Sequence, residues 1–510
     1  MKTNQIKSGV LLSYIQMALG MCISIVYTPF MLRLLGQSEY GLYNISSSVI
    51  SYLSLFNFGF GSSYVRYYTR YKKSDFGKLK SLNGLYLLVF TILGLIAFVA
   101  GIVLALNCRL IFDDGLTEKE LSLIKILMLI MSFNMAISFP ASVFVSYITA
   151  NEKFVFQKLV NMIKTVFNPM ITLVVLLLGF RSVGMTLVVT MFSLITDIIN
   201  IVYCFKKLNM EISFKNLEIK VFKEIAAFSG FIALNMIVDE INWNLDKFIL
   251  GRYSGSVATS IYAVGSTLNS YYRSISTSIT SVFTPRVHSV VLGDNGRKAI
   301  TELFVRVGRI QYIILALICS GFIFFGERFI SIWAGKGYEG AYYITLVLII
   351  PTTIPYIQGL GVEIQRAMNM HRFRSIAYSI MAILNISLSI PLCIFWDGFG
   401  AALGTSITLV LANGLLMNWY YYKKMKLGIP YFWKQIILAS RGLIMPILLG
   451  FLIYRYLLIC KIVIYVLLAI LYTVIYCASM YKFGMNEYER GLVRPVLKKC
   501  FAIERNQKDE

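Results

Sequence analysis

The sequence predicts an all-α integral membrane protein with roughly fourteen transmembrane helices. Three observations lead to this fold class, and the first is composition. Hydrophobic residues make up 57% of the 510-residue chain and charged residues 14%, with a mean hydropathy of +0.70. A water-soluble domain has about 45–50% apolar and about 25% charged residues. A chain this apolar cannot cover its surface with polar side chains, so lipid must form part of its surroundings.

The second observation is a series of apolar runs of about 20 residues, the length that crosses about 30 Å of hydrocarbon. The connections between the runs are short, and a soluble domain does not fit between them. The predicted spans, in order, are 9–32, 42–63, 81–106, 121–148, 157–180, 182–204, 223–250, 257–285, 304–326, 339–361, 373–395, 400–422, 436–456 and 461–480.

The third observation is the position of the basic residues, which give the chain a formal net charge of +23. With both termini in the cytoplasm, most Lys and Arg residues fall in inside segments such as 66–80, 206–223 and 423–434, as the positive-inside rule requires. Basic loops at a membrane surface meet anionic lipid headgroups, so they do not indicate binding of nucleic acid. The first apolar run lacks a signal-peptide cleavage site and is predicted to be a span.

An internal repeat relates two parts of the chain at a constant offset of 219 residues. The matched residues are Arg33 with Arg252, Gly36 with Gly255, Tyr43 with Tyr262, Ser47 with Ser266, and Tyr52 with Tyr271. The offset links spans 1 and 2 with spans 7 and 8, which is the register of two parallel, pseudo-symmetric six-helix lobes. We therefore expect an N-lobe at 1–222, a C-lobe at 223–425, two C-terminal helices within 426–480 and a cytoplasmic tail at 481–510.

Spans 1, 2, 7 and 8 carry polar residues at helical spacing, so each set forms one stripe along its helix. A polar stripe that faces lipid is costly, and we expect these stripes to line a hydrated cavity. Hydrogen bonding between helices by Ser, Thr and Asn is the alternative explanation. The candidate cavity residues from these spans are Gln16, Asn44, Asn242, Asn269 and Arg273.

Arg273 lies near the middle of span 8, where a guanidinium costs at least about 3 kcal/mol to insert. We expect it to bind an anion such as phosphate through paired hydrogen bonds. A structural ion pair with Asp239 or Glu240 of span 7 is the alternative. Asp239 is also a candidate site for a coupling cation. Asp246 lies nearer the outer end of span 7 and is either a further candidate or an interfacial residue.

Other features of the sequence carry less weight. Lys164 and Asp197 lie nearer the inner surface, where a polar group reaches water at little cost, and we interpret them as structural. The two histidines and the eight cysteines, which never occur at a C-x-x-C spacing, do not form a metal site. The sequence has no Walker A loop, so it is not expected to hydrolyse ATP or to hold a cofactor.

The chain resembles the polysaccharide-transporter branch of the multidrug/oligosaccharidyl-lipid/polysaccharide exporter superfamily, and more narrowly its O-antigen and capsule flippases. The segments that carry the resemblance are TPFMLRLLGQSEYGLYN, INWNLDKFILGRYSGSVATSIYAVG, FGERFISIWAGKGYEGAYYI and LNISLSIPLCIFWDGFGAALGTS. None of them is a catalytic signature, and together with the predicted spans they cover almost the whole chain.

The resemblance implies two lobes around a central, often cationic cavity lined by spans 1, 2, 7 and 8. It implies a transporter and not an enzyme: a flippase that carries an undecaprenyl-diphosphate-linked oligosaccharide to the outer leaflet of the bacterial cytoplasmic membrane. Arg273 matches a cavity arginine of the related lipid II flippases. Span 1 lacks such an arginine, which argues against lipid II as the substrate and leaves Arg66, at the inner end of span 2, as the candidate N-lobe cation. Membrane lipids, a polysaccharide polymerase and chain-length machinery are the implied partners.

Two alternatives stay open. A drug/cation antiporter of the same superfamily would use Asp239 for its cation, although Arg273 suits an anionic cargo better. A membrane glycan polymerase or glycosyltransferase would need a large external loop, and the longest outer loop here, near 107–120, is short. Because the chain has no nucleotide site, we expect the membrane potential or a proton or sodium gradient to drive transport.

Overall fold

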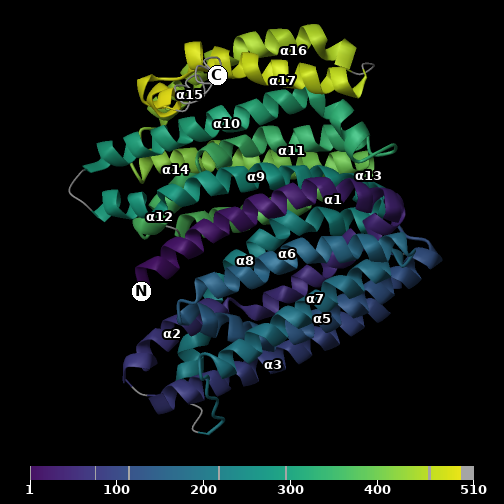
Figure 1. The fold of residues 1–510 in the computed structure, drawn as a ribbon, viewed down its shortest axis with the longest axis vertical. Coiled ribbons are helices and arrows are strands. Elements are labelled where there is room, and N and C mark those ends of the chain that lie inside the picture. Colours follow the sequence, from purple (N-terminus) through teal and green to yellow (C-terminus); the bar gives the residue numbers. More distant parts are fainter. Residues whose placement is uncertain are drawn as a thin grey trace, which may run out of the picture. The chain divides into compact units, whose positions relative to one another are not determined.

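The computed structural model describes residues 2–74, 76–112, 115–215, 219–292, 296–370, 372–457 and 461–495. Every regular element within these residues is a helix, and none of them forms a strand. Ten helical stretches of the described residues are long and apolar enough to cross a membrane. The chain is therefore an all-α, multi-pass membrane protein, as the sequence predicts (Figure 1).

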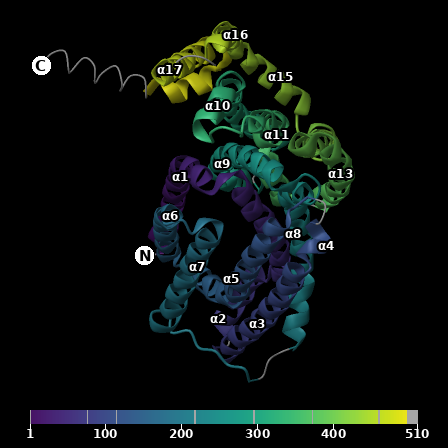
Figure 2. The same cartoon turned by 90° about the vertical axis from the view of Figure 1, so that its right-hand side faces the viewer.

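The helices form two compact units, of which the first contains Met1–Val264 and Ala382–Thr405. Its helices, in chain order, are α1 (Lys2–Leu53), the 3-10 helix η1 (Ser54–Asn57), α2 (Phe60–Ser74), α3 (Phe76–Leu106), α4 (Cys108–Phe112), α5 (Glu118–Ala150), α6 (Phe154–Leu177), α7 (Arg181–Lys206) and α8 (Ile219–Tyr253). Within this unit α7 lies against α5 and α6, and α3 lies along α5 (Figure 2). Buried side chains such as Ile45, Tyr64 and Phe90 form its core.

The second unit contains Gly265–Met381 and Ser406–Glu510. The helices that follow α8 in the chain are α9 (Gly255–Leu292), α10 (Gly296–Trp333), α11 (Gly340–Ile357), α12 (Gly359–Ala367), α13 (Arg372–Leu409), the π-helix η2 (Val410–Met417), α14 (Asn418–Lys423), α15 (Ile429–Ser440), η3 (Arg441–Leu443), α16 (Ile444–Leu457), α17 (Ile462–Ser479) and η4 (Met480–Gly484). α9 and α13 contribute residues to both units. The buried side chains of Phe304, Tyr421 and Phe432 belong to the core of the second unit.

Each predicted span falls mainly on helical residues, but two pairs of spans share one long helix. α1 covers the first span and most of the second, because the break between them is a single non-helical residue, Gly36. α13 covers the eleventh span and the beginning of the twelfth, with its break at Trp396 and Asp397. The total of roughly fourteen spans stays a prediction.

Both glycines that the repeat matches have a positive φ. Gly36 has a φ of 76° and Gly255 a φ of 83°, and each marks a break in the helical backbone. With its ψ of 172°, Gly36 adopts a conformation that is essentially restricted to glycine. The repeat therefore preserves a backbone geometry as well as a sequence pattern. The lobes predicted at 1–222 and 223–425 describe this repeat, and their boundaries stay a prediction.

One carboxylate joins three helices of the first unit. Thr117 and Glu120 form a capping box at the start of α5, in which Glu120 accepts a hydrogen bond from the Thr117 N–H at 3.0 Å. The other oxygen of Glu120 accepts hydrogen bonds from Ser38 of α1, at 2.6 Å, and from Ser256 of α9. Gly41 permits this approach of α1 and α9, because a Cβ there would collide with the backbone of Ser256.

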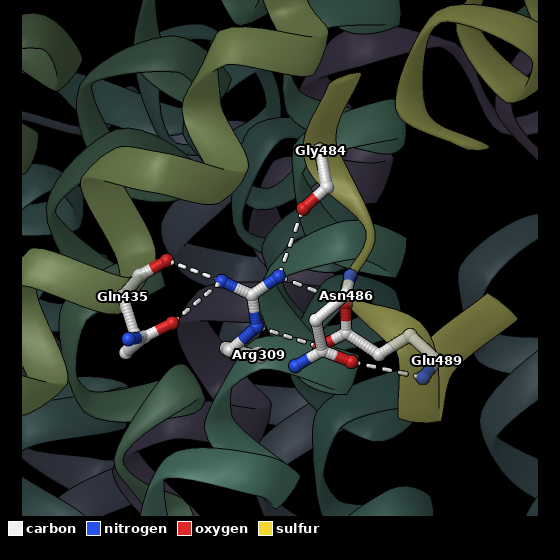
Figure 3. Close-up of polar contacts among 5 residues, drawn as sticks. All are labelled: Arg309, Gln435, Gly484, Asn486 and Glu489. Atoms are coloured by element: carbon white, nitrogen blue, oxygen red, sulfur yellow. Dashed lines mark hydrogen bonds and ion pairs between the residues drawn. The ribbon is translucent and has the colours of Figure 1, made fainter. Parts of the chain in front are cut away.

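Arg309 of α10 forms a buried ion pair with Glu489, which lies five residues beyond the end of η4 (Figure 3). Both side chains are 3% exposed. The Nε and Nη2 atoms of Arg309 donate to the two carboxylate oxygens at 2.6 and 2.8 Å. The guanidinium also donates to the carbonyl oxygens of Gln435, at 2.6 Å, and Gly484, at 2.8 Å. The charge of Arg309 is thus compensated, and all three nitrogens of its guanidinium donate hydrogen bonds.

The same glutamate begins a short helix at residues 487–495. Its carboxylate accepts a hydrogen bond from the Asn486 N–H at 2.9 Å, and the Asn486 side chain accepts one from the Glu489 N–H at 2.9 Å. Residues 481–495, predicted as the start of a cytoplasmic tail, are therefore folded onto the second unit. The rest of that predicted tail, 496–510, lies outside the described residues.

Replacement of Arg309 by Ala is expected to lower the free energy of unfolding by about 3–5 kcal/mol, because it leaves a buried carboxylate without a counter-charge. Thermal unfolding of the purified protein in detergent measures the change. Arg297→Ala, at the exposed start of the same helix, is the matched control. The double variant Arg309→Met with Glu489→Met removes both charges and should recover most of the loss. Equal midpoints for Arg309→Ala and Arg297→Ala would rule out a stabilising role for the pair.

Replacement of Gly36 by Ala is expected to destabilise the fold by about 1–3 kcal/mol through backbone strain alone. A Cβ at this position would have no atom within 4 Å, so steric collision does not contribute. Gly321→Ala in α10 is the control, since a Cβ there would meet only Tyr472 at 4.0 Å and the backbone is helical. Denaturant unfolding compares the two variants, and a loss at both positions would show that strain at Gly36 is not the cause.

Candidate functional site

Arg273 lies halfway along α9, on the part of the helix that belongs to the second unit. One face of α9 packs against other helices of this unit. On that face the Tyr272 hydroxyl is hydrogen bonded to Thr353 at 2.7 Å, and Ser276 donates to the carbonyl of Tyr356 at 2.9 Å. These bonds fix the rotation of α9 about its axis, and they therefore fix the direction in which the neighbouring Arg273 leaves the helix.

The adjacent face of α9 carries a column of hydroxyl groups that reach the molecular surface. Thr277 and Ser281 are exposed, and Ser270, Ser274 and Ser278 are half-buried. Each of these hydroxyls donates a hydrogen bond to a backbone carbonyl of α9 itself, as Ser274 does to Ser270 at 2.9 Å. Because the protons are used within the helix, the oxygen lone pairs remain as acceptors. This face is suited to ligands that carry many hydroxyl donors.

The guanidinium of Arg273 lies at the border between these two faces. Its neighbours at helical spacing are Asn269 and Ser276 on the buried side and Ser270 and Thr277 on the hydroxyl side. The Arg273 side chain is half-buried and interacts electrostatically with the phenol of Tyr356. Arg273 is therefore a half-buried cation next to both the buried face and the hydroxyl face of α9.

Two of the candidate cavity residues lie inside the protein. Asn269 is 4% exposed and accepts a hydrogen bond from the Thr352 hydroxyl at 3.1 Å. Asn44 is 9% exposed and donates to the Tyr40 carbonyl at 2.9 Å. The bond of Asn269 joins α9 to α11, which is the hydrogen bonding between helices that the sequence left open, whereas the bond of Asn44 lies within α1.

Gln16 and Arg66, the other two candidates of the first six spans, differ in exposure. Gln16 is half-buried on α1, and Arg66 is exposed on α2. The residue after Arg66, Tyr67, is buried and donates to Glu224 at 3.1 Å. Burial of the ring and this hydrogen bond raise the pKa of Tyr67, so its hydroxyl stays protonated and Glu224 keeps its donor at neutral pH.

The polar residues of the predicted stripe on α8 lie in different environments. Asp239 is exposed, Asn242 is half-buried, and Asp246 is 4% exposed. Glu240, which is half-buried, accepts a hydrogen bond from Asn244 at 2.7 Å. Asp239 and Glu240 belong to the first unit and Arg273 to the second. An ion pair between Arg273 and either of them stays a prediction. The side chain of Asn235, also part of the predicted stripe, lies outside the described side chains.

Asp246 lies in a buried cluster of oxygen atoms within the first unit, which corrects its interpretation as an interfacial residue. Its Oδ2 atom accepts hydrogen bonds from the hydroxyls of Tyr262, on α9, and Thr405, on α13, the latter at 2.7 Å. The amide oxygen of Asn385 accepts hydrogen bonds from Thr405 at 3.3 Å and from Ser389 at 2.8 Å. Three helices therefore bring four side-chain oxygens together around one carboxylate.

The second carboxylate oxygen of this cluster, Oδ1 of Asp246, is buried and has no hydrogen-bond donor. The side chain of Lys247 interacts electrostatically with the carboxylate. A buried charged oxygen without a donor is costly, and binding of a proton or a small cation would remove the cost. Among the described residues, no three His, Cys, Asp or Glu side chains cluster as a metal site would require.

Sequence reasoning missed the hydroxyl and amide partners of Asp246. Thr405 is 159 residues away from it in the chain, and Asn385 and Ser389 lie on a helix that the polar stripes did not include. The one available signal was Tyr262, which the repeat matches with Tyr43. Pairs this distant in the chain meet through tertiary folding, and no local spacing records them.

Comparison with known proteins places these observations in a family. The model of the family described as "Polysaccharide biosynthesis protein" matches residues 6–290. A Shigella flexneri protein named "Putative O-antigen transporter" is 21% identical over 419 residues, which cover 79% of this chain and 94% of that protein.

Two solved structures have the same fold. The lipid II flippase MurJ, in an inward closed conformation, matches with a TM-score of 0.69 and 20% identity over 93% of this chain and 98% of its own. An inward-facing multidrug resistance MATE family transporter of the MOP superfamily matches with a TM-score of 0.63 and 12% identity, over 83% and 99%. These relatives are transporters and flippases, which confirms the expectation of a transporter and not an enzyme. The chain shares its fold with MurJ and with this MATE transporter. Since the family model covers more than half of the chain, the protein belongs to the polysaccharide biosynthesis protein family.

Proposed function

We propose that this protein carries a polyprenyl-diphosphate-linked oligosaccharide from the inner to the outer leaflet of the bacterial cytoplasmic membrane. Its product would serve the synthesis of a surface polysaccharide, such as O-antigen, capsule or exopolysaccharide, together with a polymerase and chain-length machinery. Transport would proceed by alternating access through the cationic cavity that the sequence predicts, with both termini in the cytoplasm. The family and the name of the Shigella flexneri relative support this substrate class.

The observation that carries the proposal is the half-buried side chain of Arg273 beside a column of hydroxyl groups. A diphosphate offers the guanidinium a bidentate hydrogen-bond partner, and the sugar hydroxyls offer donors to the oxygens of Thr277 and Ser281. A cationic drug would gain nothing from Arg273. The headgroup would therefore bind along the polar face of α9 while the polyprenyl chain stays in the lipid.

A cation-coupled drug antiporter is the second candidate, and the likeness to the MATE transporter favours it. The two functions differ in the charge of the cargo. Deletion of the gene distinguishes them: the flippase predicts accumulation of polyprenyl-linked glycan on the inner leaflet, whereas the antiporter predicts sensitivity to cationic drugs with normal glycan export. Short, unpolymerised glycan in the outer leaflet would instead indicate a glycan polymerase.

We also assign the driving cation, a proton or sodium ion, to the oxygen cluster around Asp246. The support is the buried Oδ1 atom without a donor, surrounded by the oxygens of Tyr262, Thr405, Asn385 and Ser389. One carboxylate with neutral oxygens suits a monovalent ion better than a divalent one, which needs more negative charge. Asp239 and Glu240 are weaker candidates, since both reach the surface.

Replacement of Arg273 by Ala is expected to slow flipping by about 10- to 100-fold, which corresponds to the loss of roughly 1.5–3 kcal/mol of charge-assisted hydrogen bonding. Arg273→Lys keeps the charge without the planar fork and should recover part of the rate. The assay follows the fraction of lipid-linked oligosaccharide in proteoliposomes that a membrane-impermeant lectin can reach. Arg297→Ala, an exposed arginine outside α9, is the control. Flipping at the normal rate by Arg273→Ala would remove the basis of the proposed site.

Replacement of Asp246 by Asn is expected to abolish the stimulation of flipping by a sodium or proton gradient, because the neutral amide cannot hold the ion. Slow flipping without a gradient should persist, since Arg273 is intact. The same proteoliposomes, prepared with and without each gradient, provide the measurement. Asp397→Asn, at an exposed break in α13, is the matched control. If Asp246→Asn responds to the gradient as the unaltered protein does, the coupling site lies elsewhere.

A further inference from the structure

A second pair of charges lies deep within the first unit, on α6 and α7. Lys164 is ten residues from the start of α6 at Phe154, and Asp197 is nine residues from the end of α7 at Lys206. At 1.5 Å per residue, each lies roughly 15 Å from its helix end, about half of the ~30 Å hydrocarbon layer. The expectation that both lie nearer the inner surface stays a prediction, and this far inside a helix each charge is expected to have a partner in the protein.

The two charged side chains interact with each other, and Lys164 also contacts the hydroxyl of Ser193. Lys164 Nζ donates a hydrogen bond to the Ser193 hydroxyl at 2.9 Å, and it interacts electrostatically with Asp197. Ser193 and Asp197 are four residues apart and so lie on the same face of α7. The ammonium group is thus held beside the carboxylate, and both side chains are half-buried.

Two acceptor atoms near this pair have no donor. Asp197 Oδ2 and Asn200 Oδ1 are both buried without a hydrogen-bond partner, and Asn200 is only 5% exposed. Residues three apart are neighbours on a helix surface, so the two acceptors occupy adjacent turns of α7. Two buried acceptors without donors cost free energy, and a single proton on the carboxylate would serve both, because a carboxylic acid is a donor.

We propose that Asp197 is a proton-binding site within the membrane, in which the protonated carboxyl donates to Asn200 and the ionised carboxylate pairs with Lys164. The proton adds to Oδ2 and leaves from the same atom, so the charge of the site alternates between +1 and 0. This site goes beyond the proposed function, which assigns the driving ion to Asp246 on other helices.

On the helices packed against α7, Lys164 is the charged residue that influences protonation of Asp197. Among the described residues, it is the one charged group that interacts electrostatically with Asp197. Residues 126–151 of α5 and the following turn contain no charged residue, and Tyr147 is their single titratable group. Residues 8–32 of α1 are also uncharged, with Tyr14, Cys22 and Tyr27 as their titratable groups. The proton equilibrium of Asp197 is therefore set by one cation.

Infrared difference spectroscopy of the full-length protein in liposomes, between acidic and alkaline buffer, tests the proposal without substrate or gradient. A protonated carboxyl in the membrane gives its own C=O band, and we expect Asp197→Asn to lose one such band. Asp397→Asn, an exposed aspartate, should retain that band, and so should Asp246→Asn. This readout is independent of transport, so it can succeed or fail separately from the proposed flippase activity.

A second variant keeps the proposal testable if Asp197→Asn does not fold. Asn200→Leu leaves the carboxyl in place but removes its acceptor, and we expect the band to shift to higher frequency. An unchanged spectrum in a folded Asp197→Asn protein, or an unshifted band in Asn200→Leu, would overturn the proposal. Loss of sodium binding in Asp197→Asn, with no change in any carboxyl band, would overturn it in favour of a metal cation.

Discussion

In the hydrocarbon layer of a membrane, a polar side chain without a partner in the protein costs up to several kcal/mol. This constraint decides how the polar residues of this protein are arranged. Arg309 meets it with a carboxylate and two carbonyl oxygens, and the α9 hydroxyls meet it by donating to their own backbone. Side chains that satisfy the constraint completely stabilise the fold. Those that satisfy it in part, as Asp246 and Asp197 do, are where ions have something to gain.

The distinction separates residues that look alike in the sequence. Asn44 and Asn269 occur in the predicted polar stripes, as Gln16 and Arg273 do. Both asparagines nevertheless form hydrogen bonds inside their units. Asp239 and Asp246 are seven residues apart on α8, yet one is exposed and the other is surrounded by hydroxyls. A stripe identifies the helix face that avoids lipid. Whether that face meets water or another helix depends on what is packed against it.

This dependence explains how much could be predicted. The apolar runs located the long helices, since a span has to be long and apolar, but some helix ends differ by several residues, by eight at the start of α10. The repeat correctly matched Gly36 with Gly255, which both have a positive φ. The cluster around Asp246 could not be predicted, because its oxygens come from residues more than one hundred positions away. The depth of Lys164 and Asp197 in the membrane stays a prediction, because it depends on boundaries that hydropathy places only approximately.

The buried pair of Arg309 and Glu489 has a consequence for the synthesis of the protein. The two residues are 180 positions apart in the chain. At a ribosomal rate of about 5–20 residues per second, the carboxylate is made roughly 10–40 s after the arginine. Throughout that interval α10 has left the ribosome with an uncompensated cation. Until Glu489 is made, Arg309 lacks its counter-charge and needs another environment, such as the translocation channel, a water-filled crevice or lipid phosphates.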